Sequence, residues 1–126
     1  MSTRHRLLAA VVLATALTAV HQPPTSAATG REPLTAMGLV SALAAEGMAV
    51  PNPIDTTSQE CPAAGCGQAV VTDTMRVKSF PVIQQARWYA ASQRLPRFGN
   101  IVVEFAPPLS TAQCDGYLEA IGGLLP

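Results

Sequence analysis

The fold is decided by residues 75–105, which read MRVKSFPVIQQARWYAASQRLPRFGNIVVEF. Residues 75–79 alternate apolar and basic side chains, the pattern of a strand with one wet face. The run Ile-Val-Val-Glu-Phe at 101–105 is almost entirely β-branched or aromatic, which predicts a strand covered on both faces. Between them, apolar residues recur at helical spacing and predict a helix over 80–93, capped by Ser79. The three elements fit a right-handed βαβ crossover, with an antiparallel arrangement as the alternative.

Further elements flank this stretch on both sides. A broad apolar face predicts a helix over residues 33–46, and Ala-Val-Val at 69–71 predicts a short strand. Ser110 and Gln113 have the spacing of a capping box that opens a last helix, which the glycine pair 122–123 ends. The sequence therefore predicts a single small α+β domain in the order α-β-β-α-β-α, with about three strands packed against helices.

The beginning of the chain has the features of a secretory signal. Three basic residues, 4–6, precede an apolar stretch of 14 residues, 7–20. An A-x-A-like site follows and predicts cleavage after Ala27 or Ala28, which divides the chain into a removed signal, 1–28, and a mature domain, 29–126. The apolar stretch is shorter than the roughly 18 residues of a spanning helix. We therefore expect no membrane anchor after cleavage and a secreted or cell-envelope location.

Cleavage changes which chemistry the mature chain can perform. It removes both histidines, His5 and His21, and two of the eight basic residues, which leaves six basic and eight acidic residues. A net charge of −2 does not favour nucleic acid or an anionic membrane as the partner. Without histidine, neither a Ser–His nor a Cys–His nucleophile pair can form, and no histidine can bind a metal. We expect no metal and no cofactor, and a non-enzymatic protein is favoured over an enzyme.

Residues 50–67 are rich in proline, glycine and polar turn formers and predict a long irregular loop. Cys61 and Cys66 lie within it, and an oxidising location predicts a disulfide between them that staples the loop. A stapled loop could insert into the active site of a secreted enzyme. The candidate contact residues of such an inhibitor are Pro51, Asn52, Pro53 and Asp55.

Cys114 is the third cysteine of the chain. Its place on the apolar face of the last helix favours a buried free thiol. Pairing with Cys61 or Cys66, and a disulfide to another molecule, are the alternatives.

Five of the six basic residues expected in the mature chain fall between Asp73 and Glu104, with no acid among them. Strand and helix could align them into a face for an anionic envelope polymer or an acidic protein. The alternative is a solvated face neutralised by an acid from elsewhere in the chain, Glu46, Glu60, Asp115 or Glu119. Trp88 lies off the apolar side of the same predicted helix, where it could anchor a partner or a sugar ring, or pack over a strand. The five candidate residues are Arg76, Lys78, Arg87, Arg94 and Arg97.

Asp73 and Glu104 could in principle serve as a general acid and base. Nothing in their spacing brings them together. Asp73 is better placed to form an Asx-type turn, and Glu104 to face an arginine or water at the end of a strand.

A set of short sequence features resembles small exported proteins of unknown function from actinobacteria. The features are the Cys61–Cys66 pair, Val71 to Thr74, Val77, Phe80-Pro81, Ala86, Tyr89-Ala90 and Val102 to Pro108. The resemblance implies an exported α+β domain and carries no catalytic residue. We therefore expect an exported binding or interaction protein that works at the cell envelope, with an inhibitor of a secreted enzyme as the alternative.

Overall fold

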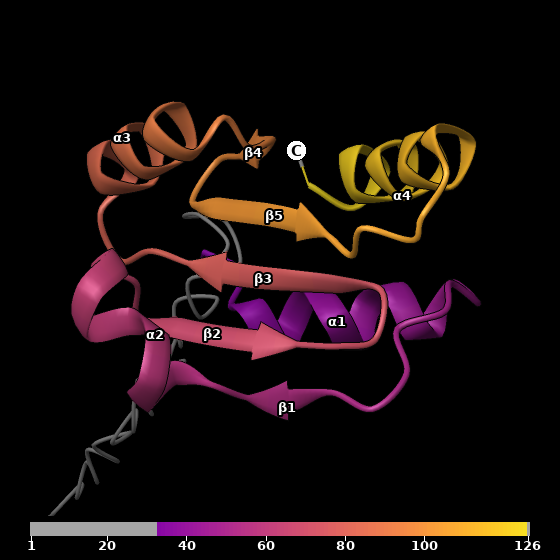
Figure 1. Ribbon diagram of the computed structural model, residues 1–126, viewed down its shortest axis with the longest axis horizontal. Coiled ribbons are helices and arrows are strands. Elements are labelled where there is room, and N and C mark those ends of the chain that lie inside the picture. The colour runs from indigo at the N-terminus through magenta and orange to yellow at the C-terminus, as the bar shows by residue number, and fades with distance from the viewer. Residues whose placement is uncertain (1–32, 126) are drawn as a thin grey trace, which may run out of the picture. The chain divides into compact units, whose positions relative to one another are not determined.

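The computed structural model describes residues 33–125 (Figure 1). The expected signal, residues 1–28, lies outside the described part of the chain. None of the helices in residues 33–125 is long and apolar enough to cross a membrane. The elements, in chain order, are α1 (Ala36–Ala45), β1 (Ile54–Asp55), α2 (Thr57–Ala64), β2 (Gln68–Val71), β3 (Met75–Ser79), α3 (Ile83–Gln93), β4 (Arg97–Phe98), β5 (Ile101–Phe105) and α4 (Thr111–Leu124).

One five-stranded sheet forms the centre of the described unit. Its strand order is β1-β2-β3-β5-β4, and every neighbouring pair is antiparallel. The α+β class agrees with the sequence prediction. The predicted sheet of about three strands and the order α-β-β-α-β-α are wrong, because β1, α2 and β4 are additional elements.

The predicted βαβ crossover is also wrong, since β3 and β5 are antiparallel. Ser79 at the end of β3 pairs with Ile101 at the start of β5, so both residues lie at the same end of the sheet. A parallel crossover would require the chain to return to the other end before β5. Helix α3 does carry the chain back, but β4 brings it forward again in a tight hairpin with β5, with Gly99 at φ 59° in the turn.

The predicted loop 50–67 contains two of the missing elements, β1 and α2. The N–H of Thr56 donates to the carbonyl oxygen of Ala69, and the hydroxyl of Thr57 accepts from the N–H of Ala69. These bonds join the segment to β2, which is distant in sequence. The residue types of the segment are typical of turns, so the sequence predicted a loop. The hydrogen bonds that order the segment are made with β2, and residue types alone do not show them.

Two helices, α1 and α3, begin later than predicted, and Ser79 does not cap α3 because it has another role. Ser79 is buried in the sheet, and its hydroxyl accepts a 3.0 Å hydrogen bond from the N–H of Ala36. It therefore anchors α1 instead of capping α3. Helix α1 begins after Thr35, whose hydroxyl accepts from Gly38. The predicted capping box of Ser110 and Gln113 is confirmed, although α4 continues through the glycine pair to Leu124.

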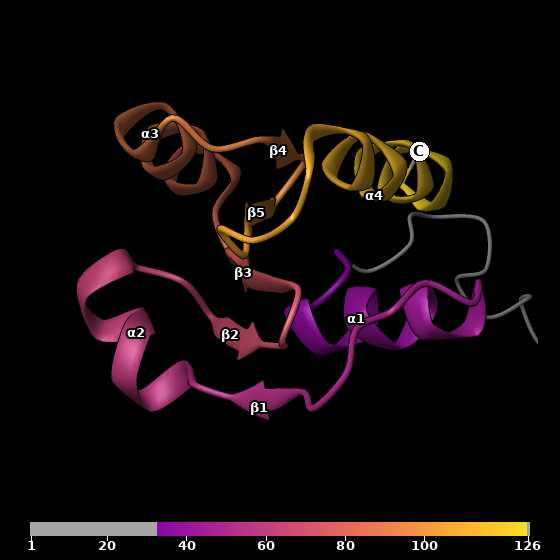
Figure 2. The ribbon, with the colours of Figure 1, turned by 45° about the vertical axis from the view of Figure 1, so that its right-hand side comes forward.

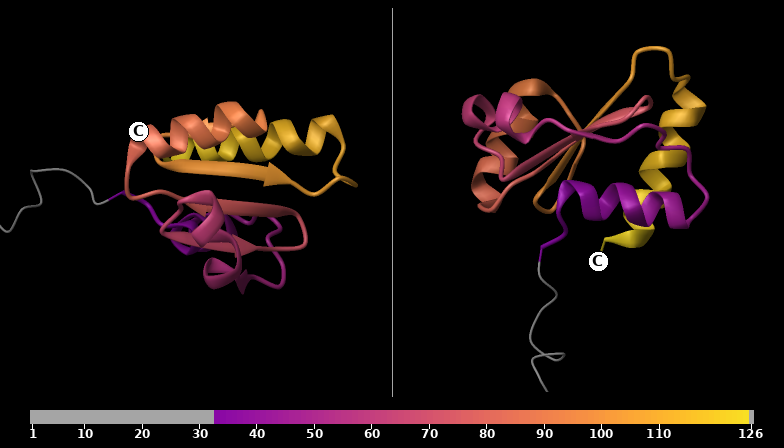
Figure 3. Two further views of the ribbon diagram at one scale, coloured as in Figure 1. Left: turned by 60° about the vertical axis from the view of Figure 1, so that its left-hand side comes forward. Right: turned by 90° about the horizontal axis from the view of Figure 1, so that it is seen from below.

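The helices cover both faces of the sheet. Helices α1 and α4 lie on one side and α2 and α3 on the other (Figures 2 and 3). The larger core lies under α1 and α4, where Val77 and Val103 meet Leu39, Leu43 and Ile121. The smaller core lies under α3 and comprises Phe80, Ala86, Ala90 and Val102. Because side chains alternate along β3, its two basic residues face the smaller core, which positions the site described next.

Candidate functional site

The five basic candidates divide into two groups with different surroundings. Arg76 and Lys78 on β3 form ion pairs with acids of the same chain. The Nε of Arg76 lies 2.9 Å from Glu60 of α2, and its Nη1 lies 3.7 Å from Glu104 of β5. These two basic residues therefore contribute to the fold, and the predicted face of five does not form as one surface.

Lys78 is the more deeply enclosed of the pair. Its side chain is 7 % exposed, its Nζ lies 3.2 Å from a carboxylate oxygen of Glu60, and the ammonium sits 5.4 Å from the centre of the Tyr89 ring. The ion pair and the cation–π contact compensate for the loss of hydration. Lys78 is consequently a residue that joins α2, β3 and α3.

Glu60 is the common partner in this network. Burial alone would raise the pKa of Glu60, but the hydroxyl of Thr56, the ammonium of Lys78 and the guanidinium of Arg76 outweigh burial and lower it. The carboxylate therefore stays charged below its usual titration range. Two positive charges and one hydroxyl converge on it, which fixes α2 against the sheet.

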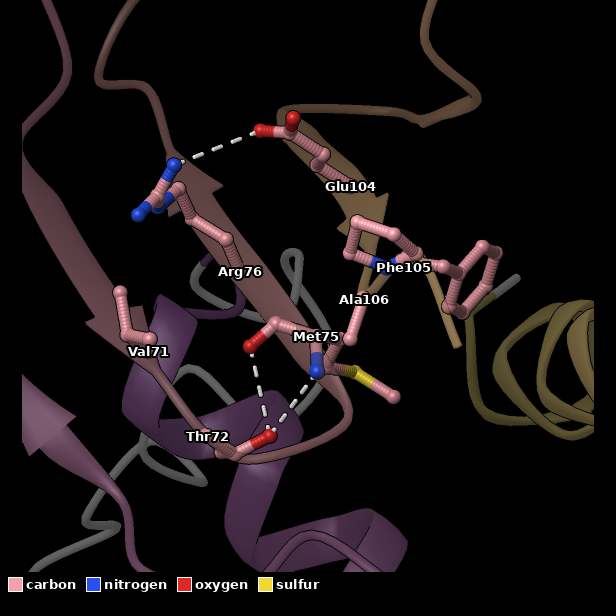
Figure 4. Close-up of a pocket in the computed structure, with 8 residues that line it drawn as sticks. Val71, Thr72, Met75, Arg76, Glu104, Phe105 and Ala106 are labelled. Atoms are coloured by element: carbon pink, nitrogen blue, oxygen red, sulfur yellow. Dashed lines mark hydrogen bonds and ion pairs between the residues drawn. The ribbon is translucent and has the colours of Figure 1, made fainter. Parts of the chain in front are cut away.

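Beyond these pairs, the same face of the sheet carries a small pocket (Figure 4). It has a volume of about 180 Å³ and lies between Val71, Arg76, Glu104 and Ala106. In Figure 4, Arg76 and Glu104 point toward each other along one side. The nearby hydroxyl of Thr72 accepts hydrogen bonds from the N–H groups of Thr74 and Met75. The polar groups that line the pocket are thus already bonded within the protein: Arg76 to Glu104, and Thr72 to backbone N–H groups.

A second hollow, of about 450 Å³, lies at the start of α1. Its polar side chains also serve the fold: Gln68 accepts from the N–H of Met37, and Asn100 donates to the carbonyl oxygens of Leu34 and Phe80. Ser79 and Gln68 thereby satisfy two N–H groups of the first helical turn, those of Ala36 and Met37, and Asn100 ties the preceding residue Leu34 to the sheet. The hollow is therefore part of the anchor of α1.

Helix α3 touches the sheet through a narrow stripe. Ala86 and Ala90 are its buried residues and pack on Val102. Two small side chains four residues apart let the helix approach the strand closely while most of its surface stays outside the core. Of the four exposed large apolar residues among those described, three belong to this helix or precede it directly: Val82, Ile83 and Trp88.

The second group of basic residues lies on the outside of α3 and on β4. Arg87, Arg94 and Arg97 are exposed, and within residues 33–125 none of them forms an ion pair. Trp88 stands beside Arg87 and is 69 % exposed, so the predicted alternative that it packs over a strand is wrong. We call the surface of Arg87, Trp88, Arg94 and Arg97 the arginine–tryptophan face.

Two of these arginines have defined backbone settings. Arg94 follows the last turn of α3 with φ 55° and ψ 48°, a left-handed conformation that usually belongs to glycine or asparagine at a helix end. A residue with a Cβ there costs roughly 1 kcal/mol relative to glycine. The guanidinium of Arg97 donates a 2.8 Å hydrogen bond to the carbonyl oxygen of Gly99 in the hairpin turn.

The predicted loop contacts lie at the sheet edge next to β1. The amide of Asn52 donates to the carboxylate of Asp73 at 2.7 Å, and the carbonyl oxygen of Pro51 accepts from the N–H of Asp73. Asp55 accepts from the N–H of Thr57 at the start of α2. The hydroxyl and the N–H of Thr57 lower the pKa of Asp55. Of the four candidates, Pro53 is exposed and takes part in none of these bonds.

The predicted disulfide between Cys61 and Cys66 is present. It closes the end of α2, where Gly65 adopts φ 80° beside Gln85 of α3, and it does not enclose Pro51 to Asp55. Cys114 is free and partly buried in α4.

The two candidate carboxylates stay apart in their hydrogen bonding. Asp73 accepts from the side-chain amide of Asn52, and the turn hydrogen bonds that the sequence predicts for Asp73 are made by the hydroxyl of Thr72; Glu104 faces Arg76 as the sequence predicts. Among the described residues, no three Cys, Asp or Glu side chains come close enough together to hold a metal ion.

The sequence pattern predicts Trp88 off the apolar side of its helix, and its exposure agrees with that position. Glu60 is one of the four acids that the sequence offers to neutralise the basic residues, and it is the one that pairs with Arg76 and Lys78; nothing in the sequence singles it out, because α2 is not predicted. No protein-family model, curated protein or solved structure matches the chain. A functional proposal must therefore rest on the geometry of the arginine–tryptophan face.

Proposed function

We propose that the chain is an exported, non-enzymatic binding protein of the cell envelope that holds an anionic partner on the arginine–tryptophan face. The observation that carries the proposal is the unequal use of the basic residues. Arg76 and Lys78 are bound to Glu60, whereas the three arginines of α3 and β4 have no acidic partner within residues 33–125.

The chemistry of this face suits carboxylate or phosphate groups. An arginine guanidinium presents two parallel N–H donors that match either group, and it keeps its charge at every physiological pH. Arg87 lies on α3 and Arg94 follows its last residue, so the two are seven positions apart and about 10 Å apart along the helix axis; the face therefore fits a partner with repeated charges better than a single small ion. Tryptophan and arginine are also the residue types that dominate binding energy at interfaces.

Trp88 gives a direct test, because it is the only tryptophan in the sequence. Its fluorescence can be followed while the purified exported protein is titrated with poly-L-glutamate, a carboxylate polymer, or with polyphosphate. We expect saturable binding that weakens as salt is added, because the charges are exposed. The triple variant Arg87→Gln, Arg94→Gln, Arg97→Gln should bind at least about ten-fold more weakly.

A second triple variant controls for total charge. Glutamate at Ser41, Ala44 and Ala45 of α1 changes the net charge by the same amount, and all three positions are exposed and lie outside the arginine–tryptophan face. This control should bind within about two-fold of the unaltered protein. The proposal is overturned if neither polymer binds, or if both triple variants lose affinity equally.

The sheet edge near β1 supports a second candidate, an inhibitor of a secreted enzyme. Asn52 is held in a left-handed conformation by its bond to Asp73, and Ile54 beside it is 60 % exposed. A rigid exposed segment lowers the entropic cost of binding. Nanomolar inhibition of a secreted hydrolase that is lost in Ile54→Asp, but kept in the arginine variant, would favour this candidate over the first.

A further inference from the structure

The acids that remain without a partner lie on the other side of the sheet. Asp55 accepts from a backbone N–H, and side chains of the same unit engage Glu60, Asp73 and Glu104. Three described acids form no ion pair or side-chain hydrogen bond with another residue of 33–125: Glu46 at the end of α1, and Asp115 and Glu119 on α4. Helices α1 and α4 cover one face of the sheet and α3 the opposite face (Figure 3). The described unit is therefore electrically two-sided.

The exposed side of α4 also carries a glycine with open space above it, Gly116. Asp115 and Glu119 lie on the side of the helix away from Tyr117 and Ile121, which are buried in the core. Gly116 lies to one side of the two acids on the helix surface, and nothing lies within 4 Å of the position that its Cβ would occupy. A helix face with two carboxylates beside an open glycine can receive a flat aromatic ring and pair with arginines next to that ring.

We propose that a second copy of this chain is an anionic partner of the arginine–tryptophan face, and that it docks through the outer side of α4. This inference rests on the proposed function, since it uses the same face. In the contact, Trp88 of one copy covers Gly116 of the next, and Arg87 and Arg94 pair with Asp115 and Glu119. A partner of this kind matches the observed charges without any additional molecule.

The arrangement must be head-to-tail. A two-fold contact of the arginine–tryptophan face with itself would place three unpaired arginines of each copy opposite one another, and like charges in contact disfavour the complex. Because the two complementary surfaces lie on opposite faces of the sheet, each bound copy presents a fresh α4 surface and a fresh arginine–tryptophan face. Contacts between different surfaces close into a ring or continue as a chain.

Sedimentation equilibrium of the purified exported protein, up to about 1 mM, tests the association. We expect species larger than one copy at low salt, and their loss as salt is raised. Two neutralised variants, Arg87→Gln with Arg94→Gln and Asp115→Asn with Glu119→Gln, should each associate at least about ten-fold more weakly. All four side chains are exposed, and circular dichroism verifies that both variants fold.

Mixing the two variants is the experiment that decides whether the contact is head-to-tail. The arginine variant keeps an intact α4 surface, and the acid variant keeps an intact arginine–tryptophan face, so one contact between them remains possible. We expect a one-to-one pair that grows no further. A mixture that stays as single copies, or variants that associate as strongly as the unaltered chain, overturns the head-to-tail contact.

The outcome separates this inference from the function on which it rests. A chain that remains a single copy at every concentration, yet binds poly-L-glutamate through its arginines, refutes self-association and retains the binding protein. A chain that does neither refutes both.

Discussion

Replacing Glu60 by glutamine tests the network that holds α2 on the sheet. The substitution keeps the shape and an acceptor oxygen but removes the charge that Lys78 and Arg76 share, at 3.2 and 2.9 Å. Removing one partner of a buried ion pair costs about 3–5 kcal/mol. Glu60 is 20 % exposed and glutamine can still accept a hydrogen bond, so we expect a loss of roughly 2 kcal/mol.

For a domain of this size, that loss corresponds to a decrease in melting temperature of about 8–16 °C. Thermal unfolding followed by circular dichroism measures it. Glu104→Gln is the matched control, because the same chemical change is made in an exposed pair at 3.7 Å, and it should cost no more than about 0.5 kcal/mol.

Combining Glu60→Gln with Lys78→Met shows whether the cost comes from an uncompensated buried charge. The free energy of unfolding of the double variant should fall by about 1 kcal/mol less than the sum of the decreases in the two single variants. The reason is that the double variant leaves no buried Lys78 ammonium without its carboxylate partner. Additive losses, or a Glu60→Gln protein that melts with the unaltered chain, would refute the network as described.

The lowered pKa of Glu60 also predicts how the stability of the protein changes at acidic pH. The pKa of Glu60 is lower in the folded protein than its ordinary value of 4.5. A lowered pKa means that the stabilisation is complete above the unfolded value and is lost as the pH falls through the folded value. The unaltered protein should therefore lose stability in that acidic window more steeply than the Glu60→Gln variant. Parallel acid profiles for the two would contradict this assignment.

Three other expectations concern single features of the fold. Replacing both Cys61 and Cys66 by alanine should lower the free energy of unfolding in urea by about 2 kcal/mol, since the disulfide closes a short loop; an unchanged urea midpoint would count against this staple. Arg94→Gly should raise stability by about 0.5–1 kcal/mol by relieving the left-handed conformation, and should weaken the binding of poly-L-glutamate; lower stability would show that the conformation is not strained. Ser110→Ala should cost about 1 kcal/mol through loss of the capping box, whereas a change under about 0.2 kcal/mol would indicate that this helix start contributes little.

Local signals in the sequence predicted the elements whose own residues define them. The alternation of β3 matches its observed bounds, and the capping box of Ser110 predicted the start of α4. Elements that depend on distant partners were missed. Strand β1 has two residues and exists through its pairing with β2, and Ser79 serves α1 instead of the neighbouring α3. The residue types of β1 and of Ser79 do not show which other part of the chain each one pairs with.

The candidate site shows the same division. An excess of basic residues between Asp73 and Glu104 is visible in the sequence, and so is the outward position of Trp88. Alternation along β3 turns Arg76 and Lys78 toward α2, where Glu60 neutralises them. Only the placement of α2, which the sequence did not predict, divides five basic residues into two that stabilise the fold and three that stay available.

The most direct measurement of the central claim is a map of where an anionic probe binds. Backbone amide shifts can be recorded by nuclear magnetic resonance while poly-L-glutamate is added, at a protein concentration at which sedimentation finds single copies. The account predicts that the largest shifts fall on residues 87–98, with the amides of α1 and α4 unmoved. Shifts concentrated at the pocket beside Arg76 and Glu104, or at residues 51–55, would contradict it.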